Sequence, residues 1–214
     1  MNKDVKAIVF DLGGVLLDLD FQKTFHAMSE VLQMEFSPEN ISDETNNLLA
    51  EYEKGKVRTE TLIWHLQRLN KEVIVPEPSA MIMAWNAMLV GFKQSKLDIL
   101  KQLKMDYRLY LLSNTNELHL KRIDQILLEQ YHIQDFEGAF FDKAYYSHLI
   151  GMRKPDSEIY HFVTQDIGIS PEKILFIDDN VANISAAEQY GWQTILYDVN
   201  TDLADNLQHR LKFL

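Results

Sequence analysis

The sequence contains no cysteine, and this absence excludes disulfide bonds, Cys-ligated metal sites and catalysis by a thiol. Basic residues are also scarce, because 21 Lys and Arg stand against 32 Asp and Glu, for a net charge of -11. The Lys and Arg clusters that bind a nucleic-acid backbone are not visible, so we expect no nucleic-acid partner. A ligand that carries phosphate would therefore need local positive charge.

Long apolar runs are missing too. The longest apolar segments fall far short of the ~20 residues of a membrane-spanning helix. The opening MNKDVKAIVF lacks the apolar stretch and the cleavage site of a signal peptide. We therefore expect a cytoplasmic protein without a membrane partner. With 214 residues, 46% of them hydrophobic, the chain is long enough for one substantial core and a small second domain. The sequence is compatible with a monomer or a homodimer.

Short apolar segments recur along the chain and indicate β-strands. Between them lie segments with apolar residues three or four positions apart, which is the spacing of a helix. Strands that alternate with helices favour right-handed crossovers and a parallel sheet covered on both faces. The expected fold class is therefore α/β, with a Rossmann-like doubly wound parallel sheet. The predicted strands lie at residues 6–11, 107–114, 138–142, 173–179 and 192–198.

The stretch from Phe21 to about Gly91 is predicted to be helical, without a convincing strand. It follows the first strand directly, and open α/β sheets bind ligands at the carboxyl ends of their strands. We therefore expect an inserted helical cap domain at residues 18–91 that overhangs the site as a lid. Residues 1–17 and 92–214 would form the core domain, and the segment 201–214 would end it as an amphipathic helix.

Several acidic and polar residues end the predicted strands and would meet at one edge of the sheet: Asp11, Ser113, Asn114, Asp178 and Asp179. Any one of them alone is typical of a helix cap or a turn. Three carboxylates in one cleft repel one another, and a bound divalent cation would remove that conflict. Oxygen ligands without Cys or His suit Mg²⁺. Gly13 would let its backbone carbonyl approach the ion closely.

Lys154 lies just before a predicted helix start at Pro155 and Asp156. A lysine beside the positive end of a helix is well placed to hold a phosphate or to neutralise a nucleophilic carboxylate. On its own, a lysine in this position is typical of a solvated loop. It gains significance from the acidic residues predicted at the sheet edge.

Four segments together resemble the motifs of the haloacid dehalogenase-like hydrolase superfamily: VFDLGGVL, LLSN, RKPD and FIDDN. They occur in the superfamily's order, and the helical insertion is similar to its α-helical cap. The resemblance implies a Mg²⁺-dependent phosphatase that acts on a small phosphorylated metabolite through an aspartyl-phosphate on Asp11. The DLGGV pattern is similar to a bacterial branch that includes α-glucose-1-phosphate phosphatases, which implies a sugar phosphate.

The resemblance also implies roles for individual residues. Asp11 would be the nucleophile, and Lys154 would balance the charge of Asp11 and of the phosphoryl group. The metal ligands would be Asp11, the carbonyl of Gly13, Asp178 and Asp179. The phosphate ligands would be Ser113, the backbone of Asn114 and Lys154.

Position 13 departs from the commonest pattern of the superfamily, because glycine stands where most of its phosphatases carry a second aspartate. That aspartate acts as general acid and base, a role worth about 10²–10⁴-fold in rate. A good leaving group would need less protonation, with help from water, a cap residue, Asp18 or Asp20.

Two other interpretations of Gly13 stay open. A 2-haloacid dehalogenase releases a halide that needs no proton, and a degenerate member would bind a phosphorylated ligand without turnover. We rank the phosphatase first. The superfamily's dehalogenases work without Mg²⁺, so the pair Asp178 and Asp179 would be superfluous in one, and the retained Asp11 and Lys154 favour an active enzyme.

Overall fold

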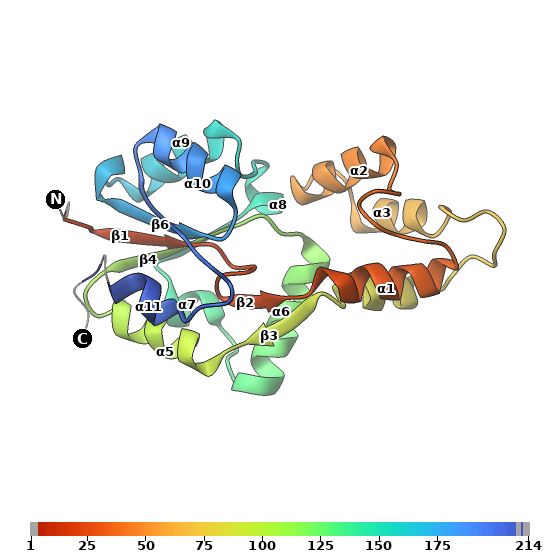
Figure 1. Cartoon of the computed structure of the whole chain (residues 1–214), viewed down its shortest axis with the longest axis horizontal. Coiled ribbons are helices and arrows are strands. Elements are labelled where there is room, and N and C mark those ends of the chain that lie inside the picture. Colours follow the sequence, from red (N-terminus) through yellow and green to blue (C-terminus); the bar gives the residue numbers. More distant parts are fainter. Residues whose placement is uncertain (1–3, 209–210, 212–214) are drawn as a thin grey trace.

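The computed structural model describes residues 4–208 and residue 211. Its centre is a sheet of five parallel strands in the order β5-β4-β1-β6-β7 (Figure 1). The predicted α/β class with a parallel sheet is therefore confirmed. In chain order these strands are β1 (Ala7–Phe10), β4 (Arg108–Ser113), β5 (Lys143–Tyr146), β6 (Ile174–Asp178) and β7 (Gln193–Leu196).

The central strand β1 is buried on both faces, because helices cover the sheet above and below (Figure 1). Ile8 and Phe10 face one hydrophobic core, and Ala7 and Val9 face the other. The first core is covered by α5 (Gln94–Leu103), α6 (Glu117–Tyr131), α7 (Phe136–Phe140) and α11 (Leu203–Gln208). The second is covered by α9 (Ser157–Ile167) and α10 (Val181–Tyr190), and the short α8 (Ser147–Ile150) follows β5.

One predicted strand is wrong. Residues 138–142 belong mostly to helix α7, and the strand follows it as β5. Asp135 caps this helix, because its carboxylate accepts a hydrogen bond from the Gly138 N–H at 2.8 Å. A short apolar run fits a buried helical turn as well as a strand, so the pattern did not separate the two.

The stretch 21–91 is also not purely helical. Its end forms β3 (Leu89–Phe92), which pairs antiparallel with β2 (Leu17–Leu19), so that Leu17 lies opposite Phe92. This two-stranded ribbon carries the helical insertion, by which we mean residues 20–88. The helices of the insertion are α1 (Phe21–Leu32), α2 (Asp43–Glu53), α3 (Thr59–Leu66) and α4 (Pro78–Asn86).

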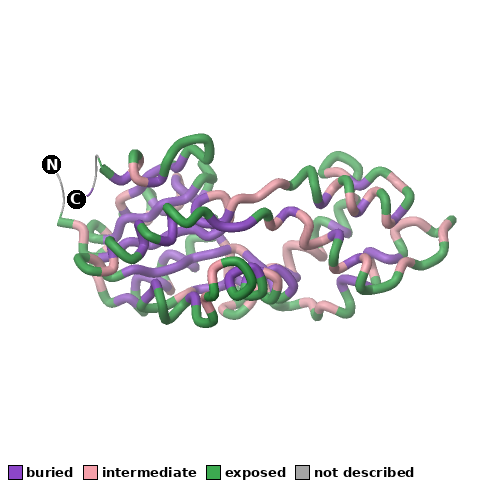
Figure 2. The backbone as a smooth tube through the Cα atoms, turned by 90° about the horizontal axis from the view of Figure 1, so that it is seen from below, coloured by how far each residue is buried: buried purple, intermediate pink, exposed green. Residues whose placement is uncertain are grey.

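The helical insertion has a hydrophobic core of its own, built around Met28, Leu62 and Met81. Leu118 from helix α6 joins this cluster and so ties the insertion to the sheet domain. Buried backbone concentrates around the sheet, whereas intermediate and exposed stretches are more frequent in the insertion (Figure 2). The insertion therefore rests on a smaller core than the sheet.

The predicted C-terminal helix is present in part. Helix α11 buries Leu203 and Leu207 against the sheet core. Residues 209, 210 and 212–214 of the predicted segment lie outside the described residues. None of the described helices has the length and apolarity needed to cross a membrane.

Candidate active site

Three buried charged side chains form the centre of the candidate site, at the carboxyl edge of the sheet. Lys154 Nζ lies 2.8 Å from Asp11 Oδ1 and 2.7 Å from Asp178 Oδ2. Asp11 follows β1 and Asp178 ends β6, so two neighbouring parallel strands deliver both carboxylates. Lys154 is 1% exposed, which rules out a solvated loop position. Each charge depends on its partners, because an unpaired buried charge is strongly destabilising.

Asn114, which follows β4, fixes the backbone of Lys154. Its Oδ1 accepts a hydrogen bond from Lys154 N at 2.9 Å, and its Nδ2 donates to the Lys154 carbonyl at 2.8 Å. The sequence predicted a role for the backbone of Asn114 and missed this role of the side chain. No local pattern signals it, because the two residues lie 40 positions apart.

The carboxylate of Asp178 is held on all sides. Asn183 Nδ2 donates to both of its oxygens at 3.0 Å, and Asn180 N donates to Oδ1 at 2.8 Å. Asn183 was not among the residues predicted from the sequence, although its place in the first turns of α10, five positions after Asp178, points its amide back to the sheet edge. These bonds fix Asp178 before any ligand arrives.

Asp179 lies at the more open side of the site, against the loop after β1. A side chain at Gly14 would place its Cβ 2.1 Å from Asp179 Oδ2, and Gly14 has a φ of +79°. Only glycine combines that backbone conformation with so close an approach. Gly14, the second glycine of the DLGGV segment, therefore leaves room for the side chain of Asp179, which lies in the loop after β6.

The donor set fits a divalent cation. One carboxylate oxygen from each of Asp11, Asp178 and Asp179 lies within 4.8 Å of the other two. Three carboxylates against one ammonium leave two negative charges. Burial raises the pKa of Asp11 to about 7, with Lys154 opposing and Asp178 adding to the rise. Partial desolvation by the surrounding site, together with the charge of Asp178, also raises the pKa of Asp179. A cation at this point would favour the charged form of both acids.

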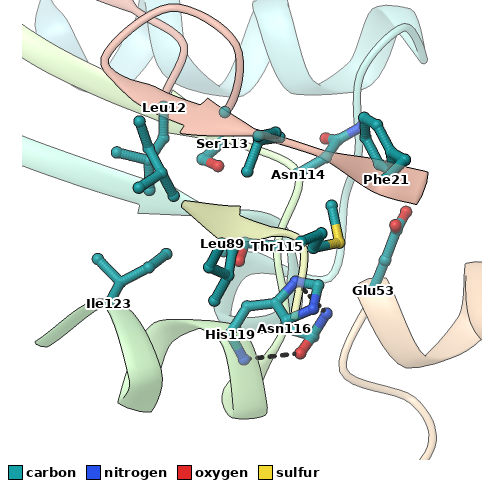
Figure 3. Close-up of a pocket in the computed structure, with 14 residues that line it drawn as sticks. Leu12, Phe21, Glu53, Leu89, Ser113, Asn114, Thr115, Asn116, His119 and Ile123 are labelled. Atoms are coloured by element: carbon teal, nitrogen blue, oxygen red, sulfur yellow. Dashed lines mark hydrogen bonds between the residues drawn. The ribbon is translucent and has the colours of Figure 1, made fainter. Parts of the chain in front are cut away.

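A pocket of about 140 Å³ lies between the sheet edge and the helical insertion (Figure 3). Gly13, Ser113 and Asn114 line it from the sheet side, and Phe21 and Glu53 line it from the insertion. Ser113 is 3% exposed at the end of β4. Two of the three predicted phosphate ligands, Ser113 and Asn114, thus share one pocket with the carboxylate of Glu53, which was not predicted from the sequence.

His119 on helix α6 joins the two parts of the molecule beside this pocket. Its ring stacks on Trp85 of the insertion, with centroids 5.5 Å apart. Nδ1 lies 3.1 Å from Asn116 Nδ2, and Nε2 lies 3.3 Å from the Trp85 carbonyl. Burial lowers the pKa of His119 to about 4, so the ring is neutral near pH 7.

Asp18 and Asp20, considered as substitutes for the missing acid, have other roles. Asp18 pairs with Lys96 at 2.8 Å and with Lys93 at 3.4 Å. Asp20 caps helix α1 by accepting a hydrogen bond from Gln22 N at 3.1 Å. Neither lines the pocket.

Comparisons with known proteins find similar chains. A relative named D-ribitol-5-phosphate phosphatase, from Bacteroides thetaiotaomicron, is 28% identical over 95% of this chain and 97% of its own. The crystal structure of a HAD family enzyme from the same organism, a magnesium complex, has a TM-score of 0.83 and 29% identity over 95% of this chain and 98% of that one. A predicted HAD-like family hydrolase from Porphyromonas gingivalis has a TM-score of 0.84 and 28% identity, over 99% and 100% of the two chains.

A family model supplies the assignment. The model described as haloacid dehalogenase-like hydrolase matches residues 5–191, which include β1, the helical insertion and β6. Together with the parallel sheet and the acidic edge, this match shows that the chain belongs to the haloacid dehalogenase-like hydrolases.

Proposed function

We propose that the protein is a Mg²⁺-dependent phosphatase that hydrolyses a small phosphate monoester through an aspartyl-phosphate on Asp11. The observation that carries this proposal is the arrangement of Asp11 at the sheet edge. Its Oδ1 accepts a hydrogen bond from Leu12 N at 2.7 Å and pairs with Lys154. Within the described part of the chain both contacts go to Oδ1, which leaves Oδ2 to attack phosphorus.

The reaction would proceed in two displacements. In the first, Oδ2 of Asp11 bonds to phosphorus and the ester oxygen leaves, taking up a proton to become the alcohol. In the second, water attacks the aspartyl-phosphate, gives up a proton, and releases inorganic phosphate and free Asp11. Lys154 offsets the negative charge of Asp11 and of the phosphoryl oxygens throughout.

Asp11, Asp179 and the carbonyl of Gly13 would hold Mg²⁺, with Asp178 completing the acidic set. Asp178 has both oxygens bonded by Lys154 and Asn183, whereas Asp179 is exposed and reaches the loop after β1. This contrast favours Asp179 as the more direct ligand of the pair. When bound, the ion would orient the phosphoryl group and neutralise its oxygens.

Phosphate binding would fall to the side-chain hydroxyl of Ser113, the backbone N–H of Asn114, and Lys154. The division into a core domain of residues 1–17 and 92–214 and a cap domain of residues 18–91 belongs to the same proposal. In it, the insertion contributes the contacts to whatever the phosphate is attached to.

The pocket favours a small alcohol as the leaving group. Its 140 Å³ is close to the roughly 150 Å³ of a cavity that admits benzene, which suits a small leaving group such as a short polyol or a sugar. The relative named for D-ribitol 5-phosphate supports the same class. We therefore propose polyol and sugar phosphates as substrates.

A phosphate-release assay with Mg²⁺ tests this proposal, using D-ribitol 5-phosphate, glucose 1-phosphate and GMP. Chloride release from 2-chloropropionate is measured in parallel, as the test for a dehalogenase. We expect activity on the polyol or sugar phosphate, its loss with EDTA, and a loss of about 10⁴-fold or more in Asp11→Asn. Asp98→Asn, an exposed acid on helix α5, is the matched control and should keep full activity.

Two results would overturn the proposal. Chloride release that resists EDTA would identify a dehalogenase. Binding of phosphate esters without any phosphate release would identify a degenerate member of the family.

A further inference from the structure

The site lacks an acid where the leaving group needs a proton. Gly13 provides no side chain, and a Cβ there would lie 2.7 Å from Leu19 Cδ1. The space beside position 13 is therefore filled by an apolar side chain from β2. An alcohol is a poor leaving group without a proton donor, because an alkoxide is a strong base. The donor must come from another wall of the pocket.

Of the described residues that line the pocket, Glu53 and His119 carry ionisable side chains. His119 is a poor donor near neutral pH. Both of its ring nitrogens already face polar atoms of Asn116 and Trp85, and its buried ring is neutral near pH 7 and so lacks the acidic proton of an imidazolium. Glu53 is the remaining candidate.

Glu53 is the last residue of helix α2, in the helical insertion. Its carboxylate rises beside Phe21, across the pocket from Leu12 and Ile123 (Figure 3). One oxygen, Oε2, lies 3.1 Å from a terminal nitrogen of Arg153, the residue before the catalytic lysine. This contact lacks hydrogen-bond geometry, and within the described residues Oε2 has no hydrogen-bond partner although it is buried. Oε2 is thus held against Arg153, whereas Oε1 has no hydrogen-bond partner within the described residues and belongs to a side chain that is 33% exposed and lines the pocket. Oε1 is therefore the oxygen open to a ligand.

The surroundings of Glu53 also suit proton transfer. Burial raises its pKa above the ordinary value, and Arg153 limits that rise. Arg153 is the charged group that acts on this carboxyl from the facing core loop, and Lys54, the next residue of the insertion, pairs with Asp156 at 3.2 Å instead. An acid with a raised pKa holds its proton closer to neutral pH.

We propose that Glu53 is the catalytic acid and base that the family's pattern lacks at position 13, supplied by the helical insertion and positioned by Arg153. The inference rests on the proposed phosphatase function. As the P–O bond of the ester breaks, protonated Glu53 gives its proton to the leaving oxygen, and the alcohol departs. The resulting carboxylate then takes a proton from the water that attacks the aspartyl-phosphate, which restores the protonated acid.

This role predicts a dependence on the leaving group. 4-Nitrophenolate is a weak base and leaves without a proton, whereas ribitol needs one. With Glu53→Gln, we expect the first step on D-ribitol 5-phosphate to slow by about 10²–10⁴-fold. With 4-nitrophenyl phosphate, stopped-flow absorbance should show a burst of nitrophenolate equal to the enzyme at the wild-type rate. Slow turnover follows, because the second step has lost its base.

Glu51→Gln is the matched control, since Glu51 lies on the same helix and pairs with Lys56 at 3.3 Å near the surface. It should behave as wild type with both substrates. Thermal unfolding of Glu53→Gln checks that the variant is folded, and Glu53→Asp, which keeps a shorter acid, should recover part of the lost rate on D-ribitol 5-phosphate.

Two outcomes would overturn the role of Glu53. Wild-type rates of Glu53→Gln on both substrates would remove it from the reaction, and an equal slowing of the first step on both would make it a structural residue. Both outcomes presuppose an active wild type that Asp11→Asn silences. If the wild type releases no phosphate from any ester, the proposed function itself is wrong. This result is known before any Glu53 variant is made.

Discussion

The sheet edge and the helical insertion face each other across one pocket, and they are built differently. At the edge, Lys154 and Asp178 are 1% and 0% exposed and engage each other at 2.7 Å. Across the interface, the ion pairs between the insertion and the core include Glu53 and Arg153, whose side chains are 33% and 31% exposed. The charges at the sheet edge are thus fixed in the interior, whereas this charged contact of the insertion is partly solvated.

This difference separates two tasks of the molecule. Breaking a buried ion pair costs several kcal/mol, so the positions of the charged groups at the sheet edge are held firmly. Partly exposed pairs contribute about 0–1 kcal/mol each, so the ion pairs of the insertion add little to its attachment, which depends more on buried contacts such as that of Leu118. In the proposed function, the sheet edge would carry the shared chemistry and the insertion would meet the leaving group.

The largest effect is expected from removing the positive charge of Lys154, which Asp11 and Asp178 share at the sheet edge. Lys154→Met leaves Asp11 and Asp178 facing each other without a counter-charge, and should lower the free energy of unfolding by about 3–5 kcal/mol without metal. Lys96→Met is the matched control, because Lys96 is equally buried but its partner Asp18 is one-third exposed. Urea denaturation of both variants measures the difference. Equal losses in the free energy of unfolding would contradict the larger contribution expected of Lys154 at the sheet edge.

An intermediate effect is expected from separating the two hydrophobic cores. Leu118→Ala removes the one side chain of α6 in the core of the insertion, and should lower the local stability there by about 2–5 kcal/mol. Hydrogen exchange should then quicken at Leu62 and Leu66 and change little in β1. Ile126→Ala, on the same helix but in the sheet core, should quicken exchange in β1 instead. Identical exchange patterns would show that the two regions unfold as one unit.

The smallest effect concerns pH at the junction of the two regions. Burial holds the pKa of His119 at about 4, below its ordinary 6.5. The unfolded chain therefore binds a proton at this residue before the native state does, and stability is lost as the pH falls from 6.5 towards 4. Between pH 8 and 5 the wild type should lose about 2 kcal/mol more than His119→Gln. Urea denaturation at both pH values tests this, and parallel losses would contradict the lowered pKa.

Four of the five strands of the sheet were predicted, because short apolar runs that alternate with helical segments favour parallel strands. The segment 138–142 was predicted wrongly, since its four apolar and small residues before Asp142 suit a capped helical turn equally well. Strand β3 was not predicted either. Its pairing partner β2 lies on the far side of the whole insertion, and the sequence carries no signal for so distant a contact.

The residues of the candidate site likewise divide into those that the sequence predicted and those that it did not. Asp11, Ser113 and Asp178 were found because each ends a strand, and strand ends of a parallel sheet share one edge. Glu53 and Asn183 were not found. Their significance comes from Arg153 and Asp178, which approach them only in the folded chain.

The sequence by itself determined the parallel sheet, the acids at its edge and the glycine at position 13, because strand periodicity and residue type are local properties. Only the tertiary structure decided that Lys154 is a buried ion-pair partner and that Leu19 fills the space beside Gly13. It also brought Glu53 to the pocket. Burial and contact between distant segments depend on packing, and packing sets both the charge state and the reach of a side chain.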